Sequence, residues 1–146
     1  MGPEQIALRN ATYRLFADLG RAPAAAEVAD AMGWSAPEAE AGWRALHSSH
    51  ALALDRDGGL LMANPFSAIP TVHRVRARDR WWYANCAWDA FGICAALGAD
   101  GQIETRCGDC GQAIVVEFRS QRADDASSLF HCLVPAARWY EDIVFT

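Results

Sequence analysis

The sequence brings its most reactive side chains together in the stretch "RWWYANCAWDAFGI" at residues 80–93. Asn85 is a favourable helix N-cap, which would place Cys86 in the first turn of a helix. There the unpaired backbone N–H groups and the positive end of the helix dipole lower the pKa of a thiol and favour the thiolate. Asp89 follows three residues later and would share a helix face with Cys86. The spacing therefore predicts a nucleophilic thiol beside a carboxyl group.

Aromatic side chains flank this pair and alter its expected chemistry. A carboxylate beside a thiolate in an apolar setting has a raised pKa, so we expect Asp89 to carry a proton that it can donate. The structural alternative is that Cys86 is a core residue and that Asp89 satisfies backbone N–H groups near the helix start. The aromatic residues are Trp81, Trp82, Tyr83 and Trp88.

A second cluster, Cys107-Gly-Asp-Cys110-Gly, falls on a predicted turn between strands. One CxxC supplies half of a zinc site, and His131 and Cys132 would face opposite sides of a strand. A thioredoxin-like redox pair is disfavoured because that motif begins a helix. A structural turn with packed thiols is the default interpretation, with structural zinc as the alternative. Cys94 and Cys132 are expected to be core thiols.

The composition narrows the class of protein. The chain has 146 residues, 52% of them hydrophobic, a net charge of −5, and arginine as its only strongly basic residue. This acidic balance disfavours binding to nucleic acid phosphates. The N-terminus does not resemble a signal peptide, and no apolar run approaches the ~20 residues that span a membrane. We therefore expect a cytoplasmic protein whose five cysteines do not form a disulfide framework.

The first part of the chain predicts a helical lobe. A helix is expected over 3–19, ending at Gly20, then a short helix up to a turn at Gly33, and a third helix over 36–46 with Ser35 as its N-cap. Two short strands around 57–59 complete the order of a winged helix-turn-helix. This lobe carries five arginines and eight acidic residues, so a structural or lid role is favoured over DNA binding.

The remainder predicts a β-rich core after an extended connector at 64–70. The fold class is therefore α+β: a winged-helix-like lobe at 1–63, then a core of mainly antiparallel strands with short helices at 64–146. The expected elements are a strand at 71–77, a helix at 86–98, a hairpin around 108–111, a strand at 129–135, a short helix at 136–142 and a last strand from 143.

Four segments, "ANPFSAIPT", "WWYANCAWDAFGI", "CGDCG" and "LVPAARWYEDIVFT", resemble the organomercurial (alkylmercury) lyase family. They occur in the family's order along the whole chain, and "NCAWD" is the most specific of them. The resemblance implies cleavage of carbon–mercury bonds without an organic cofactor. It also implies action in the cytoplasm on small organomercurials, with Hg²⁺ passed on towards mercuric reductase.

The resemblance also assigns roles to individual residues. Cys86 resembles the first catalytic cysteine, which binds mercury, and Asp89 resembles the catalytic aspartate, which contacts mercury and supplies the proton. Cys107 resembles a third family cysteine that is regarded as structural. Hg(II) is a soft ion that prefers thiolates. Trp82 and Trp88 are expected to line the pocket for an alkyl or aryl group.

The sequence departs from the family pattern in three places. The second catalytic cysteine is expected directly after Thr146, the last residue given. Cys94 stands where a proline is expected, and Cys132 stands where an aromatic residue is common. For the missing ligand we weigh a truncated gene, another thiol such as Cys132 or Cys110, and a UGA codon read as selenocysteine, which we favour. A chain ending in its last strand is expected to aggregate or dimerise.

Two further classes of function remain as alternatives. One is a non-enzymatic thiol sensor or mercury-binding module whose winged lobe contacts DNA. The other is a structural zinc protein that uses Cys107 and Cys110.

Overall fold

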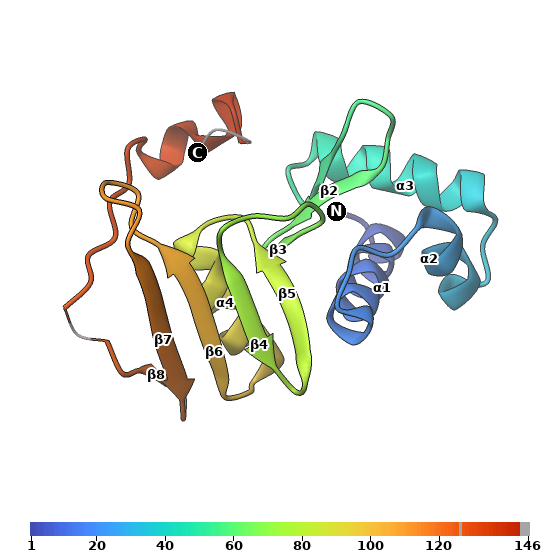
Figure 1. The fold of residues 1–146 in the computed structure, drawn as a ribbon. Coiled ribbons are helices and arrows are strands. Elements are labelled where there is room, and N and C mark those ends of the chain that lie inside the picture. The colour runs from blue at the N-terminus through green and yellow to red at the C-terminus, as the bar shows by residue number, and fades with distance from the viewer. Residues whose placement is uncertain (126, 144–146) are drawn as a thin grey trace.

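A computed structural model describes residues 1–125 and 127–143 of the chain. Within these residues three helices precede an antiparallel sheet of eight short strands, with a fourth helix packed against the sheet (Figure 1). The predicted α+β class and the winged-helix order of the N-terminal elements are confirmed. None of the helices in the described part of the chain has the length and apolar character needed to cross a membrane.

The three N-terminal helices end where the sequence predicts. Gly20 and Gly33 adopt φ values of 71° and 69°, the left-handed conformation that glycine accepts most easily. Ser35 precedes the third helix, and Glu38 reaches back to accept the Ser35 N–H at 2.8 Å. The helices are α1 (Pro3–Leu19), α2 (Ala25–Met32) and α3 (Ala36–Ser48).

The sheet runs continuously from the helical lobe into the core. The connector predicted to be extended at 64–70 contains a short strand, β3, which pairs with β2 on one side and with β5 on the other. The sheet order is β1-β2-β3-β5-β4-β6-β7-β8, so the predicted boundary after residue 63 falls inside one sheet and stays a prediction. The strands are β1 (Ala53–Leu54), β2 (Leu60–Ala63), β3 (Phe66–Ser67), β4 (Arg74–Ala77), β5 (Arg80–Ala84), β6 (Gly101–Arg106), β7 (Ala113–Arg119) and β8 (Arg122–Ala123).

One face of the sheet carries the core, because alternate residues of the central strands point to it. Val75, Trp82 and Ile103 are each at most 1% exposed on this face. Helix α4 (Ala87–Leu97) covers it, and the Trp82 indole N–H donates to the Phe16 carbonyl of α1 at 3.2 Å. Truncating a buried tryptophan of this kind costs about 3–5 kcal/mol. This hydrogen bond thereby joins β5 to the helical lobe, while α4 packs on the sheet.

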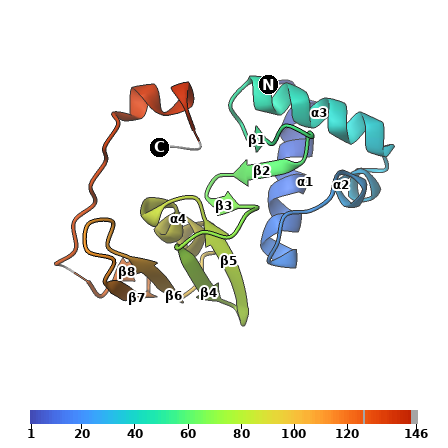
Figure 2. The ribbon, with the colours of Figure 1, turned by 45° about the horizontal axis from the view of Figure 1, so that its top comes forward.

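The segment after β8 crosses back towards the helical lobe (Figures 1 and 2). The strand predicted at 129–135 is not formed: these residues have no strand partner in the described part of the chain, and Leu129 is 94% exposed. Apolar composition alone does not make a strand without a partner. The short helix predicted next is present as the 3₁₀ helix η1 (Ala136–Glu141), and the Tyr140 hydroxyl donates to the His50 carbonyl at 2.9 Å. The last predicted strand falls on 144–146, outside the described residues.

Candidate active site

Cys86 lies at the junction where β5 leads into α4. Its backbone is extended, with φ −146° and ψ 177°, so Cys86 is itself the N-cap and α4 begins at Ala87. The prediction that Asn85 caps this helix was wrong by one residue. The Cys86 sulfur takes the place of the usual capping oxygen and accepts the Asp89 N–H at 3.4 Å. This cap fixes the thiol above the first turn, on the side of Asp89.

The Asp89 carboxyl group receives two side-chain hydrogen bonds. Asn85 Nδ2 donates to Asp89 Oδ2 at 3.1 Å, and the Cys86 thiol donates to the same carboxyl group. Partial burial raises the pKa of Asp89, and the hydrogen bonds from Asn85 and Cys86 offset part of that rise. The raised pKa expected for this carboxyl group from the sequence is confirmed.

The pKa of the Cys86 thiol departs from the prediction. Burial raises this pKa, and the adjacent negative charge of Asp89 raises it further. The backbone N–H groups of Asp89 and Trp88 lower it, as expected for a helix start, but by less. The predicted lowering of the thiol pKa was therefore wrong, because removal from water outweighs the helix terminus. The Cys86 thiol therefore keeps its proton to a higher pH than an ordinary cysteine does.

Asn85 and Asn64 support the site, although the sequence predicts only a connector at Asn64. Asn85 Nδ2 also donates to Asn64 Oδ1 at 2.9 Å, which joins the start of α4 to the end of β2. Pro65, next to Asn64, packs on α4 closely: a Cβ added at Gly92 would lie 3.1 Å from the Pro65 Cβ. An amide beside a proline is a common turn signal, so the sequence alone does not mark Asn64 as part of a site.

The four aromatic residues near the pair are distributed over two environments. Trp82 is 1% exposed and belongs to the core, so its role as a pocket wall stays a prediction. Trp88 is 65% exposed and meets Phe130 edge to face, with ring centroids 5.4 Å apart. Phe91 contacts the other side of Phe130 at 5.5 Å. The apolar surface beside the pair thus comes from α4 together with Phe130, which the sequence analysis placed in a strand.

The second cysteine pair lies on the turn between β6 and β7, as predicted. Cys110 is exposed and Cys107 is partly exposed, so the expectation of packed thiols is not met. Backbone N–H groups of Cys110 and Asp109 and the Cys110 thiol hydrogen-bond to the Cys107 sulfur and lower the pKa of that thiol. The described residues contain no group of three or more potential metal ligands, so they do not complete a zinc site here.

The two remaining cysteines have different surroundings. Cys94 is buried under the sheet, as predicted, and burial raises its pKa to about 11. Cys132 is exposed, so the expectation that it is a core thiol was wrong. It lies in the segment that does not join the sheet, and therefore no neighbouring strand covers it.

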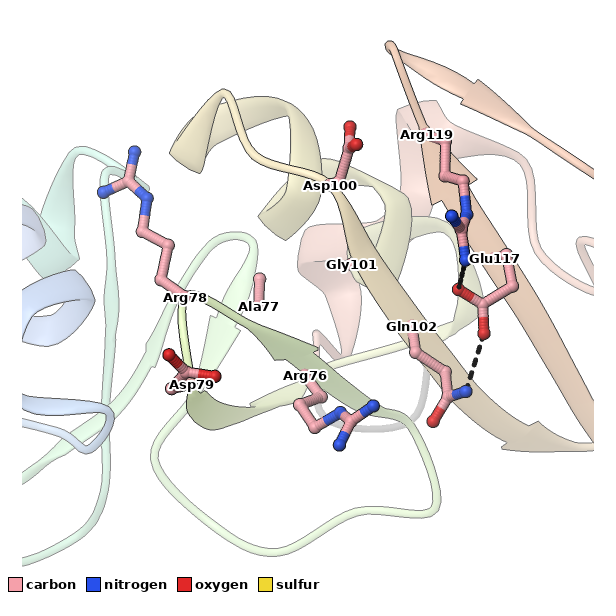
Figure 3. Close-up of a pocket in the computed structure, with 9 residues that line it drawn as sticks. All are labelled: Arg76, Ala77, Arg78, Asp79, Asp100, Gly101, Gln102, Glu117 and Arg119. Atoms are coloured by element: carbon pink, nitrogen blue, oxygen red, sulfur yellow. Dashed lines mark hydrogen bonds and ion pairs between the residues drawn. The ribbon is translucent and has the colours of Figure 1, made fainter.

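Two surface hollows lie on the side of the sheet that α4 does not cover, and neither contains Cys86 or Asp89. The first has a volume of about 340 Å³, and its polar walls include Glu117, which accepts from Gln102 at 2.7 Å and pairs with Arg119 at 3.4 Å (Figure 3). Charged walls of this kind suit water and ions better than an apolar ligand. The role of Cys86 and Asp89 as the reacting pair therefore stays a prediction that neither hollow supports.

Comparison with known proteins identifies the fold and the family. A crystal structure described as the mercury-bound form of MerB2 matches with a TM-score of 0.68 and 22% sequence identity, over 86% of this chain and 60% of that chain. At this identity the match shows a shared fold, and the chain spans 60% of that protein's length. A search of curated proteins finds no match. The family model "MerB: Alkylmercury lyase" matches residues 66–145, more than half of the sequence, and the chain therefore belongs to the alkylmercury lyase family.

Proposed function

We propose that the protein cleaves the carbon–mercury bond of organomercurials by protonolysis, releasing a hydrocarbon and Hg(II). One contact carries the proposal: the Asp89 N–H donates to the Cys86 sulfur at 3.4 Å, which holds the thiol beside the half-buried Asp89 carboxyl group. The thiol is a soft ligand for mercury, and the carboxyl group is placed to receive the proton that the thiol must lose. Family membership supports the same chemistry.

The first step is the binding of mercury by Cys86. An S–Hg bond forms as the bond between mercury and its counter-ligand, such as chloride, breaks and the Cys86 proton passes to Asp89. Formation of the S–Hg bond drives this proton transfer, and the raised pKa of Asp89 lowers its cost, because burial disfavours the charged carboxylate. Mercury replaces the proton as the electrophile on sulfur, so the Cys86 thiolate is never left exposed as a free anion in this half-buried place.

The second step returns the proton to the substrate. Protonated Asp89 donates to the carbon attached to mercury, and the electron pair of the carbon–mercury bond forms the new carbon–hydrogen bond. The hydrocarbon leaves, Asp89 becomes a carboxylate, and Hg(II) remains on the Cys86 sulfur without a change of oxidation state. Asn85 Nδ2, 3.1 Å from Asp89 Oδ2, stabilises the carboxylate that results.

The exposed edge-to-face pair of Trp88 and Phe130 supplies an apolar surface for an alkyl or aryl group next to the thiol. The second mercury ligand stays a prediction: the residue after Thr146, or failing that Cys132 or Cys110. Reading the nucleotides after the Thr146 codon tests the selenocysteine hypothesis. A UGA followed by an open frame would support it, and any other codon there would remove it.

The direct test replaces the proposed nucleophile. Cys86→Ser should abolish release of benzene from a phenylmercury salt and tight retention of the mercurial, because a hydroxyl is a hard, weak mercury ligand. Gas chromatography of the headspace and elemental mercury analysis measure the two effects. Cys94→Ala is the matched control, since it removes a buried thiol two turns further along the same helix. Equal release by the Cys86→Ser variant would rule out the proposal.

The proposal also specifies the substrates, the cofactor requirement, the cellular location and the acceptor of the product. The substrates are small organomercurials, no organic cofactor takes part, the site of action is the cytoplasm, and mercuric reductase is the expected acceptor of Hg(II). A non-enzymatic mercury sensor would bind mercurials through Cys86 but release no hydrocarbon. The placement of Asp89 as a proton donor favours the enzyme, because a sensor has no use for it.

A further inference from the structure

The hairpin turn between β6 and β7 presents two thiols from a single well-ordered loop. The Cys107 N–H donates to the Gln112 carbonyl at 2.8 Å, and the Gly111 N–H donates to the Cys107 carbonyl at 2.9 Å. Gly111 has a φ of 72°, which a residue with a side chain adopts only with strain. These bonds close the turn, so Cys107 and Cys110 start from fixed and neighbouring backbone positions.

The two thiols belong to one closed turn, with only Gly108 and Asp109 between them in the sequence. Two cysteines at this spacing are the usual pair that binds one metal ion from a single turn. Both cysteines reach solvent, since Cys110 is exposed and Cys107 is partly exposed. The pair is therefore an accessible chelate with soft donors.

The number of protein ligands at the β6–β7 turn decides which metal ion can bind there. Across the described ranges, 1–125 and 127–143, no cluster of three or more His, Cys, Asp or Glu side chains is placed to hold a metal. Zinc in proteins is almost always held by three or four such ligands, so this pair would leave it under-coordinated. A soft ion such as Hg(II) is satisfied by two thiolates on opposite sides of it.

The register of the sheet puts this turn at the same end as Cys86. Tyr83 of β5 and Glu104 of β6 both pair with Arg74 of β4, so they lie level on either side of it. Cys86 and Cys107 each follow three residues later, just past the ends of β5 and β6, which run in the same direction. Only β4 separates the two strands, a lateral spacing of roughly 10 Å.

We infer that Cys107 and Cys110 form a second mercury site, a two-thiolate chelate that takes Hg(II) from Cys86 after the carbon–mercury bond is cleaved. The binding stands on the geometry of the turn, whereas the transfer rests on the proposed lyase function. Hg(II) keeps its oxidation state throughout. The two thiols each lose a proton as their sulfur–mercury bonds form. One proton returns to Cys86 as its bond to mercury breaks, and the other leaves to solvent with the remaining ligand that mercury carried, such as chloride or hydroxide.

The test uses inorganic Hg(II), so that it does not depend on lyase activity. Reduced full-length Cys86→Ser protein is mixed with mercuric chloride and excess glutathione, desalted, and analysed for mercury and zinc. We expect about one mercury per chain, because a chelate resists a monothiol competitor. Adding either Cys107→Ser or Cys110→Ser should lower retention by about tenfold or more, since one thiolate competes poorly alone. Adding Cys94→Ala, which removes a buried thiol outside the turn, should change nothing.

Three results would overturn the inference. The first is unchanged retention in both the Cys107→Ser and the Cys110→Ser backgrounds. The second is loss of retention with Cys94→Ala. The third is stoichiometric zinc in the purified protein that disappears with Cys107 or Cys110. Circular dichroism melts of all variants separate loss of the site from loss of the fold. Absence of hydrocarbon release by the unaltered protein would refute the lyase proposal but would leave this measurement intact.

Discussion

Cys86 and Cys107 both have backbone N–H groups near their sulfur atoms, but their pKa values shift in opposite directions. Each sulfur receives hydrogen bonds from two backbone N–H groups, yet the pKa of the Cys86 thiol is raised and that of Cys107 is lowered. Cys86 is partly buried beside a carboxyl group, whereas Cys107 stands in a turn that water reaches. Backbone donors therefore set the pKa of a thiol only where burial and nearby negative charge do not outweigh them.

The largest expected effect comes from removing the charge beside Cys86. Asp89→Asn should lower hydrocarbon release by about 10²–10⁴-fold, the usual contribution of a general acid. The same change should let Cys86 react with iodoacetamide at lower pH, because the neighbouring negative charge and the hydrogen bond to the carboxylate raise its pKa. Headspace chromatography and mass spectrometry of the alkylated protein measure these effects.

The matched control for that variant is Asp109→Asn at the other thiol pair. The Asp109 charge contributes least among the causes acting on the pKa of Cys107, so this change should leave both release and the Cys86 alkylation profile unaltered. Normal release by the Asp89→Asn variant would remove Asp89 from the mechanism.

The next largest effect is the order in which the cysteines of the unaltered protein are alkylated as the pH rises. Alkylation followed across pH should modify Cys107 at lower pH than Cys86, because the thiolate is the reactive form. Cys94, whose pKa is raised to about 11 and which is buried, should be the slowest of the three. Peptide mass spectrometry resolves the positions. If Cys86 were modified before Cys107, the explanation from burial would be wrong.

A smaller effect concerns stability. The pKa of Asp89 in the folded protein is raised, so its contribution to stability is full below the ordinary pKa of the carboxyl group and is lost as pH rises through the folded pKa. Asp89→Asn should therefore melt at a higher temperature than the unaltered protein at neutral pH. The difference should vanish in acid, where both side chains are neutral. Thermal melts at the two pH values decide this.

The smallest effect isolates the geometry of the turn. Gly111→Ala should cost about 1 kcal/mol, because Gly111 has a φ of 72°. It should also move alkylation of Cys107 to higher pH by disturbing the backbone donors. Gly108→Ala is the control, since a Cβ there meets nothing within 4 Å and its φ is not positive. Equal behaviour of the two variants would show that the turn does not set the reactivity of Cys107.

Much of the fold follows from local signals in the sequence. Gly20, Gly33 and Ser35 mark helix ends through backbone requirements that involve only neighbouring residues, and these predictions were confirmed. The strand predicted at 129–135 was wrong, and the short strand β3 within the connector was missed. Strands depend on partners distant in sequence, and an apolar run does not say whether a partner is available.

In the candidate site, too, the features set by neighbouring residues were predictable and those set by distant residues were not. The proximity of Cys86 and Asp89 follows from helical spacing, and the raised pKa of Asp89 follows from its apolar neighbours. The direction of the Cys86 shift did not follow, because it depends on how deeply α4 is buried against the sheet. The hydrogen bond from Asn85 to Asn64 joins residues 21 positions apart and could not be read from either local segment.

That hydrogen bond also has an evolutionary consequence. Asn64 follows β2 and Asn85 precedes the proposed nucleophile, so the orientation of the Asp89 carboxyl group depends partly on a residue outside the proposed reacting pair. A change at position 64 alters the donor available to Asp89 only through position 85. In related sequences these two positions should therefore vary together, as pairs that keep a donor and an acceptor, and such covariation would record selection on the orientation of Asp89.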